Sequence, residues 1–545
     1  MFLFVFFLTA LWLAAQSPQW LWAKQAGGLS EDRGYSIAID NSGNSYITGK
    51  ISGTAIFGNN SLTTNGGEDI FIAKLDSNGN HLWANQAGGI YNENGTCIAT
   101  DNSGNCYITG SFRYNATFGN TNLASNENED IFVAKLDTDG NWLWAKQAGG
   151  TSSDGGGGIA ADNSGNCYVT GVFSDFATFG TTSLSCLGAT DIFIAKLDTN
   201  GDWLWAKQAG GTGNDGGYAI STNSSGSSYV TGYFRGPASF GGTTLSSSGY
   251  SDIFIAKLDT NGDWLWAKQV GSTSTEQSLG ITTDGSGNCF VTGWFEGNAI
   301  FGNTTLTSGG SFVAKLDTDG NWQWAKKVGE SSSVYGYSIT IDSSGNSYVA
   351  GNFHGTASFG GTNFSSNGSF DIFIAKLDTN GNLLWAKQAG GCGEDRGNGI
   401  ATDGSGNSYV TGYYNSGANF DSTMLISSGG YDIFVAKLSS STFVSDEYGV
   451  PQAHFSLGQN HPNPFTASTS FELEVSDAKA VYEVSVYDLR GRHICTLYRG
   501  VLPAGKKTFT WNGKDAAEKE LSSGVYFYRV SNGIASQVKK MIYVR

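Results

Sequence analysis

Hydrophobic and polar residues alternate along most of this chain in short runs, and the runs return in the same order about every 61 residues. Between residues 97 and 146, four such runs follow one another, at 97–100, 106–110, 130–136 and 142–146. Alternation with a period of two predicts β-strands with one buried face. Turn sequences rich in Gly, Asn and Asp separate the runs. The pattern therefore predicts an all-β protein with four antiparallel strands in each repeat.

The fourth run of each repeat carries the phrase Trp-Ala-Lys-Gln-Ala-Gly-Gly or a near copy, and the phrase occurs seven times. Its tryptophans are Trp22, Trp83, Trp144, Trp205, Trp266, Trp324 and Trp385, spaced by 61 residues with one step of 58. Repeats of this length are typical of solenoids and closed propellers. Seven units of four strands predict a seven-bladed β-propeller. We expect these tryptophans to pack between blades, although tryptophans on an exposed outer strand could instead stack on sugar rings.

The two ends of the repeat region predict how the ring closes. The repeats begin with a fourth strand at 20–24 and end after a third strand at 432–438. The first strand of the chain can therefore complete the last blade, which removes a free sheet edge.

The two ends of the chain differ in composition from the repeats. Residues 1–15 form an apolar run that ends in small residues, which predicts a signal peptide and therefore export; no other segment is long and apolar enough to cross a bilayer. The net charge is −16, which argues against a nucleic-acid partner. Residues 456–545 carry 12 Lys and Arg against 8 Asp and Glu, whereas the rest carries 19 against 39. We therefore expect a repeat domain at 17–440, a linker at 441–455 and a second domain at 456–545.

The repeat resembles a known family. Asp-x-Ser-Gly-Asn-x-Tyr-Val-Thr-Gly, then Phe-Gly, then Asp-Ile-Phe-Ile-Ala-Lys-Leu-Asp and Trp-Ala-Lys-Gln are similar to the bacterial SBBP-type β-propeller repeat. The resemblance covers about residues 17–440. It implies the fold and an exported protein, and it implies no single activity, because propellers host many functions.

The last 90 residues predict a small Ig-like β-sandwich, with strands at 469–475, 482–489, 507–511 and 524–530. They closely resemble the type A sorting domain of the type IX secretion system. The matching residues include Asn460, Pro462, Asn463, Pro464, Phe465, Gly491, Gly524 and Tyr526. The resemblance implies export through the outer membrane by that machinery; the alternative is an ordinary Ig-like module.

No sequence motif for catalysis is present: the five histidines occupy unrelated positions, and HExxH, P-loop and Ser/His/Asp patterns are missing. An acid does recur ten residues after the repeated tryptophan in six repeats. These acids are Asp32, Glu93, Asp154, Asp215, Glu276 and Asp395, with Val334 in the seventh repeat. We expect them to ring one mouth of the central channel, where they could bind a cation such as Ca²⁺. The alternative is that each acid caps backbone N–H groups of its own loop, with no cofactor.

The sequence favours a non-catalytic scaffold, secreted or held on the outer cell surface, that binds an extracellular protein or glycan. Two alternatives stay open: an extracellular polysaccharide hydrolase or lyase, and a structural component of a surface layer or matrix. A deep pocket lined by residues found in one blade only would favour an enzyme. Near-identical loops around a shallow face would favour a binder or a structural ring.

Overall fold

The structure of the chain is a computed structural model, which describes residues 18–440, 455–475, 481–488, 492–531 and 536–545. The chain divides into two compact units between Thr442 and Phe443, and each is described by itself. All regular elements of the described residues are β-strands, and none of those residues forms a helix that could span a membrane. The predicted signal peptide at 1–15, most of the predicted linker and Gly491 lie outside the described residues.

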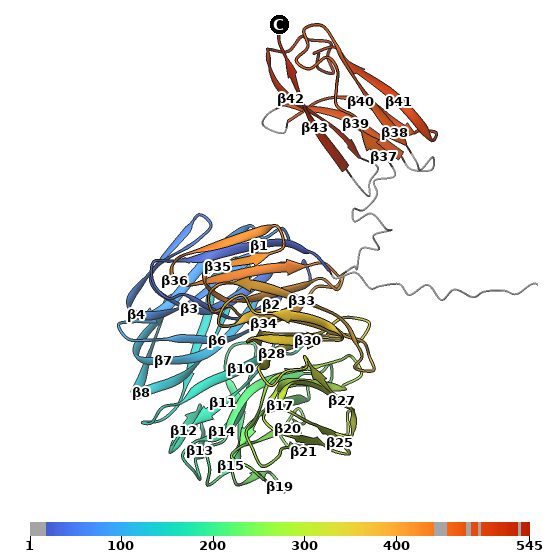
Figure 1. Cartoon of the computed structure of the whole chain (residues 1–545). Helices are drawn as coiled ribbons and strands as arrows, with labels where there is room; N and C mark the ends of the chain where they lie inside the picture. The colour runs from blue at the N-terminus through green and yellow to red at the C-terminus, as the bar shows by residue number, and fades with distance from the viewer. Residues whose placement is uncertain (1–17, 441–454, 476–480, 489–491, 532–535) are drawn as a thin grey trace, which may run out of the picture. The chain divides into compact units, whose positions relative to one another are not determined.

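The first unit confirms the seven-bladed propeller, with four antiparallel strands in each blade (Figure 1). The innermost strands are β2 (Arg33–Ile39), β6 (Asn94–Thr100), β10 (Gly155–Ala161), β16 (Gly216–Thr222), β22 (Glu276–Thr283), β28 (Val334–Ile341) and β34 (Arg396–Thr402). The second strands are β3 (Ser45–Phe57), β7 (Cys106–Phe118), β11 (Cys167–Phe173), β17 (Ser228–Phe234), β23 (Cys289–Phe295), β29 (Ser347–Phe353) and β35 (Ser408–Phe420). The third strands are β4 (Asn60–Leu75), β8 (Thr121–Leu136), β14 (Asp191–Leu197), β20 (Asp252–Leu258), β26 (Gly310–Leu316), β32 (Asp371–Leu377) and β36 (Thr423–Leu438). The outer strands are β5 (His81–Gly89), β9 (Trp142–Ala148), β15 (Trp203–Gly211), β21 (Trp264–Val270), β27 (Trp322–Val328), β33 (Leu383–Gly391) and β1 (Trp20–Gly28).

The ring closes as predicted, because β1 pairs antiparallel with β36 and so forms the outer strand of the last blade (Figure 1). The pairing runs from Trp22 opposite Lys437 to Ala26 opposite Ile433. Trp20 is 8% exposed and packs edge-on against Phe420, with ring centroids 5.0 Å apart. The first and last strands of the repeat region thus share one sheet.

A short hairpin between the second and third strands of every blade is the element that the sequence pattern did not reveal. In four blades it is a separate pair of strands: β12 (Phe176–Phe179) with β13 (Thr182–Ser185), β18 (Pro237–Phe240) with β19 (Thr243–Ser246), β24 (Ala299–Phe301) with β25 (Thr304–Leu306), and β30 (Thr356–Phe359) with β31 (Thr362–Ser365). In the other three blades it continues the long second and third strands. The hairpin also pairs with the outer strand of the preceding blade, as where Gly28 lies opposite Ala55. A Cβ on Gly28 would lie 1.9 Å from the carbonyl oxygen of Thr54, so this close approach requires glycine.

The repeated tryptophans pack between blades, as expected. The Trp22 indole N–H donates to the carbonyl of Ser77 in the next blade at 3.2 Å. Equivalent bonds join Trp83 to Thr138, Trp144 to Thr199, Trp205 to Thr260, Trp266 to Thr318 and Trp324 to Thr379. Each bond satisfies a carbonyl in a turn of the neighbouring blade, so these tryptophans join adjacent blades.

The second unit consists of two antiparallel sheets, β37-β38-β41 and β40-β39-β42-β43. Its strands are β37 (Phe455–Leu457), β38 (Thr469–Val475), β39 (Val481–Asp488), β40 (His493–Val501), β41 (Gly505–Trp511), β42 (Gly524–Ser531) and β43 (Ser536–Tyr543). Phe465 is 2% exposed and lies against Trp511 and Tyr543 in the core. Asn460 is also buried, and its amide donates to Thr469 Oγ1 at 2.8 Å. Several residues that carry the sorting-domain resemblance therefore hold this small domain together.

Candidate functional site

The six recurring acids do not lie exposed around the channel mouth. Their exposed fractions run from 0 to 2%, for Asp32, Glu93, Asp154, Asp215, Glu276 and Asp395. The expectation of an accessible acidic ring is therefore wrong. The physical reason is that the chain turns sharply from an outer strand into the next inner strand, and the backbone N–H groups of that turn need a buried acceptor.

Asp32 illustrates how these acids bind the backbone. One carboxylate oxygen accepts the N–H of Gly28 at 2.7 Å, at the end of the outer strand. The other accepts the N–H of Ser52 at 2.9 Å, on the second strand of the next blade. Asp154 and Asp215 make the same two bonds in their own blades. Each of these acids therefore joins two blades.

Each of the six acids also lies near a second buried carboxylate, which the sequence reading missed. The pairs are Asp32 with Asp432, Glu93 with Asp69, Asp154 with Asp130, Asp215 with Asp191, Glu276 with Asp252, and Asp395 with Asp371. The second acid begins the buried part of the third strand. A signal for the pairing was present in the sequence: the repeat with Val334 in place of the first acid also has Gly310 in place of the second. Both acids are absent from the same repeat, which agrees with their pairing in the other blades.

Burial raises the pKa of these carboxyls, and the neighbouring carboxylate adds to the effect. The pKa of Glu93 rises to about 7, with burial the largest cause and the charge of Asp69 a smaller one. The pKa of Asp32 rises to about 6 for the same reasons, although its backbone hydrogen bonds oppose the shift. Both effects favour the neutral form of these carboxyls in the folded chain.

Calcium binding by these acids stays a prediction. The described residues contain no group of three or more His, Cys, Asp or Glu side chains arranged to hold a metal ion. Calcium takes six to eight oxygens, so backbone carbonyls and water would have to supply most of them. Calorimetric titration of the full chain with Ca²⁺ tests the point. The absence of both binding heat and a shift in Tm would end the hypothesis.

The residues that do line the channel come from a β-bulge in every innermost strand. In β2 the pairing with β3 skips from Gly34 to Ser36, which leaves Tyr35 unpaired. The same skip occurs in all seven innermost strands. A bulge redirects its side chain relative to the regular strand. The bulged residues, called here the bulge ring, are Tyr35, Thr96, Gly157, Tyr218, Leu279, Tyr337 and Asn398, and all line a cavity of about 210 Å³ at the centre of the propeller.

The bulge ring varies between blades, although the residues on either side of it are small in every blade. The residue before each bulge is glycine in six blades and Ser278 in the other. The residue after it is small in every blade. The bulged position itself carries Tyr, Thr, Gly, Leu or Asn. The backbone of the ring is thus the same in every blade, while the side chain at the bulge differs from blade to blade.

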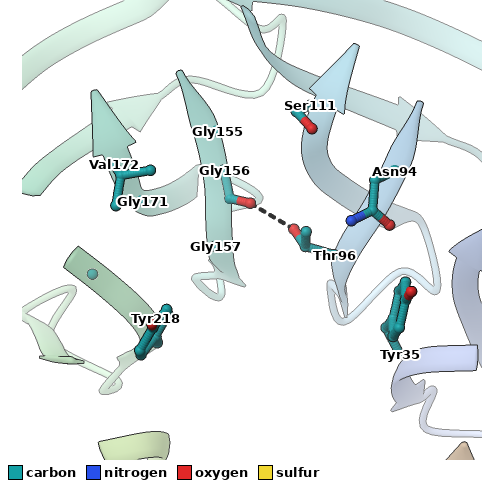
Figure 2. A pocket seen from close by; sticks show the side chains of 11 residues that line it. Tyr35, Asn94, Thr96, Ser111, Gly155, Gly156, Gly157, Gly171, Val172 and Tyr218 are labelled. Atoms are coloured by element: carbon teal, nitrogen blue, oxygen red, sulfur yellow. Dashed lines mark hydrogen bonds between the residues drawn. The ribbon is translucent and has the colours of Figure 1, made fainter. Parts of the chain in front are cut away.

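A recess of about 390 Å³ opens beside the third innermost strand, β10 (Figure 2). Gly155, Gly156 and Gly157 of β10 line it, and Tyr35 and Tyr218 of the bulge ring lie on either side of them. The other lining residues are Asn94, Thr96, Ser111, Gly171, Val172 and Gly217. None of these lining residues is charged. The volume falls in the range of about 300–1,000 Å³ typical of small-molecule sites.

Charged side chains at neighbouring positions of the inner strands are paired within the protein. The Arg33 guanidinium lies over the rings of Tyr413 and Tyr431, 5.0 and 4.6 Å from their centroids, and forms an ion pair with Glu31. Arg396 forms an ion pair with Glu394 at 2.7 Å. The uncharged recess therefore has neighbours whose charges are already compensated.

Comparisons with known proteins agree with this architecture. Residues 21–58, 143–172, 323–352 and 384–421 match the model of the SBBP beta-propeller repeat. Residues 461–536 match the FlgD Ig-like domain. The chain is a beta-propeller repeat protein with an Ig-like C-terminal domain. The acid pairs, the bulge ring and the recess all lie within the propeller.

Two distant relatives match part of the chain. An uncharacterized WD repeat-containing protein of Acanthamoeba polyphaga mimivirus is 25% identical over 68% of this chain and 34% of its own length. The regulatory protein FlaEY of Caulobacter vibrioides is 25% identical over 58% of this chain and 35% of its own. The chain thus spans about a third of the length of these relatives. Among solved structures, PorZ of Porphyromonas gingivalis, a surface component of the type IX secretion system, is 11% identical over 94% of this chain and 70% of its own, with a TM-score of 0.27.

Proposed function

We propose that this protein is a non-catalytic binding scaffold that takes an extracellular glycan or protein at the channel face of its propeller. The observation that carries the proposal is the bulge ring. Seven equivalent positions have a fixed backbone and varied side chains, and they surround the channel. Rigid scaffolds commonly present binding residues in this way.

The chemistry of the recess favours binding over catalysis. Its described lining contains no Asp, Glu, His, Cys or Lys. Ser111 and Thr96 therefore have no carboxylate, imidazole or amine in the recess to activate them as nucleophiles. The acids of the neighbouring loops accept backbone hydrogen bonds inside the blades. A polysaccharide hydrolase or lyase, one of the two alternatives, would need a general acid and base beside its substrate.

Export through the type IX secretion system is the second part of the proposal. It rests on the resemblance of residues 456–545 to type A sorting domains and on the apolar run at 1–15. In this proposal the C-terminal unit binds the secretion machinery, and the propeller reaches the outer cell surface or the medium by way of the periplasm. Replacing Phe465, which lies in the core of that unit, with Ala should leave the protein inside the producing cell.

A glycan and protein array tests the binding role directly. The full chain is compared with a variant in which Tyr35, Tyr218 and Tyr337 are all alanine. The matched control replaces Leu143, Leu204 and Leu265, which are 52–54% exposed on the outer strands, with alanine. We expect binding by the full chain and the control, and at least a tenfold loss in the tyrosine variant. Loss in the leucine control alone, or cleavage of an array ligand, would contradict the proposal, and binding to nothing would favour a structural role.

A further inference from the structure

The recess beside β10 differs from every other part of the channel because both variable positions of that strand are glycine. The first variable position lies two residues before the bulge. In the seven blades it is Arg33, Asn94, Gly155, Gly216, Gln277, Tyr335 or Arg396. The second is the bulge ring itself. Only β10 has glycine at both. The recess is therefore a local absence of side chains in a ring that otherwise has them.

The two glycines are there for different reasons. A Cβ on Gly157 would lie 2.5 Å from the carbonyl oxygen of Gly217 on the next innermost strand, so close packing of the blades requires glycine at that position. A Cβ on Gly155 would meet only the Cβ of Ser111, at 4.0 Å, and the backbone of Gly155 is not in the left-handed region. A side chain at 155 would thus fit the fold. Its absence keeps the recess open.

We propose, building on the binding role above, that this recess holds a neutral sugar ring of an uncharged glycan. Tyr35 and Tyr218 offer aromatic walls, and Asn94 and Ser111 offer an amide and a hydroxyl group. The Thr96 hydroxyl donates to the carbonyl of Gly156 and can still accept a hydrogen bond. A sugar ring presents apolar C–H faces and a rim of hydroxyls, which match these two kinds of surface. The uncharged lining gives no partner to a uronate, sulfate or phosphate, whose burial without a counter-charge is costly.

A peptide strand fits the recess less well. The channel-facing edge of β10 has no partner strand, so an extended peptide could in principle add to it. The bulge at Gly157 breaks the regular spacing of that edge, however. The carbonyl of Gly156 also already accepts the Thr96 hydroxyl at 2.7 Å (Figure 2). A continuous ladder of backbone hydrogen bonds is therefore not available.

Calorimetry with the full chain tests the assignment, using neutral hexasaccharides of glucan, mannan, xylan and galactan, a uronate hexasaccharide and an extended neutral peptide. Gly155→Gln places in the recess the side chain that β22 carries as Gln277. The matched control is Gly242→Gln, because Gly242 is exposed and a Cβ there meets nothing within 4 Å. Tyr218→Phe removes only the hydroxyl and Tyr218→Ala removes the whole ring, so the two variants distinguish their contributions to binding. Melting curves confirm that each variant is folded.

We expect one of the neutral hexasaccharides to bind, with at least a tenfold loss of affinity in Gly155→Gln and Tyr218→Ala. Gly242→Gln should bind as the unaltered chain does, and Tyr218→Phe should lose less than Tyr218→Ala. Sugar binding that is unchanged by Gly155→Gln but abolished by the triple tyrosine variant would overturn the recess and leave the proposed function standing. Binding of only the uronate or only the peptide would overturn the neutral-sugar assignment. Failure of every ligand here and on the array would overturn both proposals.

Discussion

Removing residues 18–28 should abolish cooperative folding of the propeller, the largest effect of any change considered for this chain. The deletion takes away β1, the strand that completes the last blade. It exposes one edge of β36 and the surface now covered by Trp20, Ala23 and Ala26, which are 3–8% exposed. Loss of a buried tryptophan alone costs about 3–5 kcal/mol, so we expect a loss above about 5 kcal/mol. Urea unfolding followed by tryptophan fluorescence measures it.

The matched control keeps all strands and changes only their connection. In this variant the segment 18–28 is moved to follow Leu438 through a turn copied from 76–80, so that the last blade becomes continuous in sequence. We expect the permuted chain to fold and to lose much less stability than the deletion. Equal stability of the deletion variant and the unaltered chain would mean that the ring does not depend on β1 for closure.

The stability of the propeller should be greatest in mild acid and should fall as the pH rises from about 4 to about 7. In the unfolded chain the paired acids titrate near their ordinary values of 3.8 and 4.5, whereas in the fold the pKa values reach about 6 for Asp32 and about 7 for Glu93 and Asp395. The folded chain therefore binds more protons than the unfolded chain across this window, and stability declines with pH. We expect the Tm to drop by about 5 °C or more between pH 5 and pH 8.

Glu93→Gln isolates one pair. The amide oxygen can still accept the N–H of Gly89, which the carboxylate accepts at 2.8 Å. The amide N–H₂ group adds a donor near Asp69, whose Oδ1 has no hydrogen-bond partner among the described residues. At about 1.4 kcal/mol per pKa unit, the variant should be more stable than the unaltered chain by about 2 kcal/mol at pH 8 and nearly equal at pH 5. An equal loss of stability at both pH values would show that the carboxylate is required as an anion.

The sequence was sufficient for the features that every repeat shares. Strand alternation and the spacing of Trp22 and its copies predicted four strands in seven blades, and the mismatch between the two ends predicted the closing strand. The hairpins were missed because their strands are as short as three or four residues, too short for alternation to stand out. Their Phe-Gly pairs were visible in the sequence, but no pattern within one repeat indicated that the hairpin pairs with the outer strand of the preceding blade.

The site was harder to predict because its features depend on contacts between repeats. Asp32 stood out in the sequence by its recurrence, but whether its loop faces the channel or turns inward is decided by backbone groups of two blades. Its partner Asp432 was placed at the start of the third strand, but nothing in the sequence indicated that its side chain lies beside Asp32. The bulge at Tyr35 breaks the alternation at a position whose residue differs between blades. The residues that all repeats share identified the propeller, whereas the bulge ring and the recess depend on residues that differ between repeats.

A crystal structure of the full chain with its best array ligand tests most directly whether binding occurs at the channel. We predict ligand density in the recess, between the rings of Tyr35 and Tyr218 and against the backbone of Gly155. Density on the outer strands beside Leu143 and its copies, or on the turns at the opposite face, with the recess empty, would contradict the prediction.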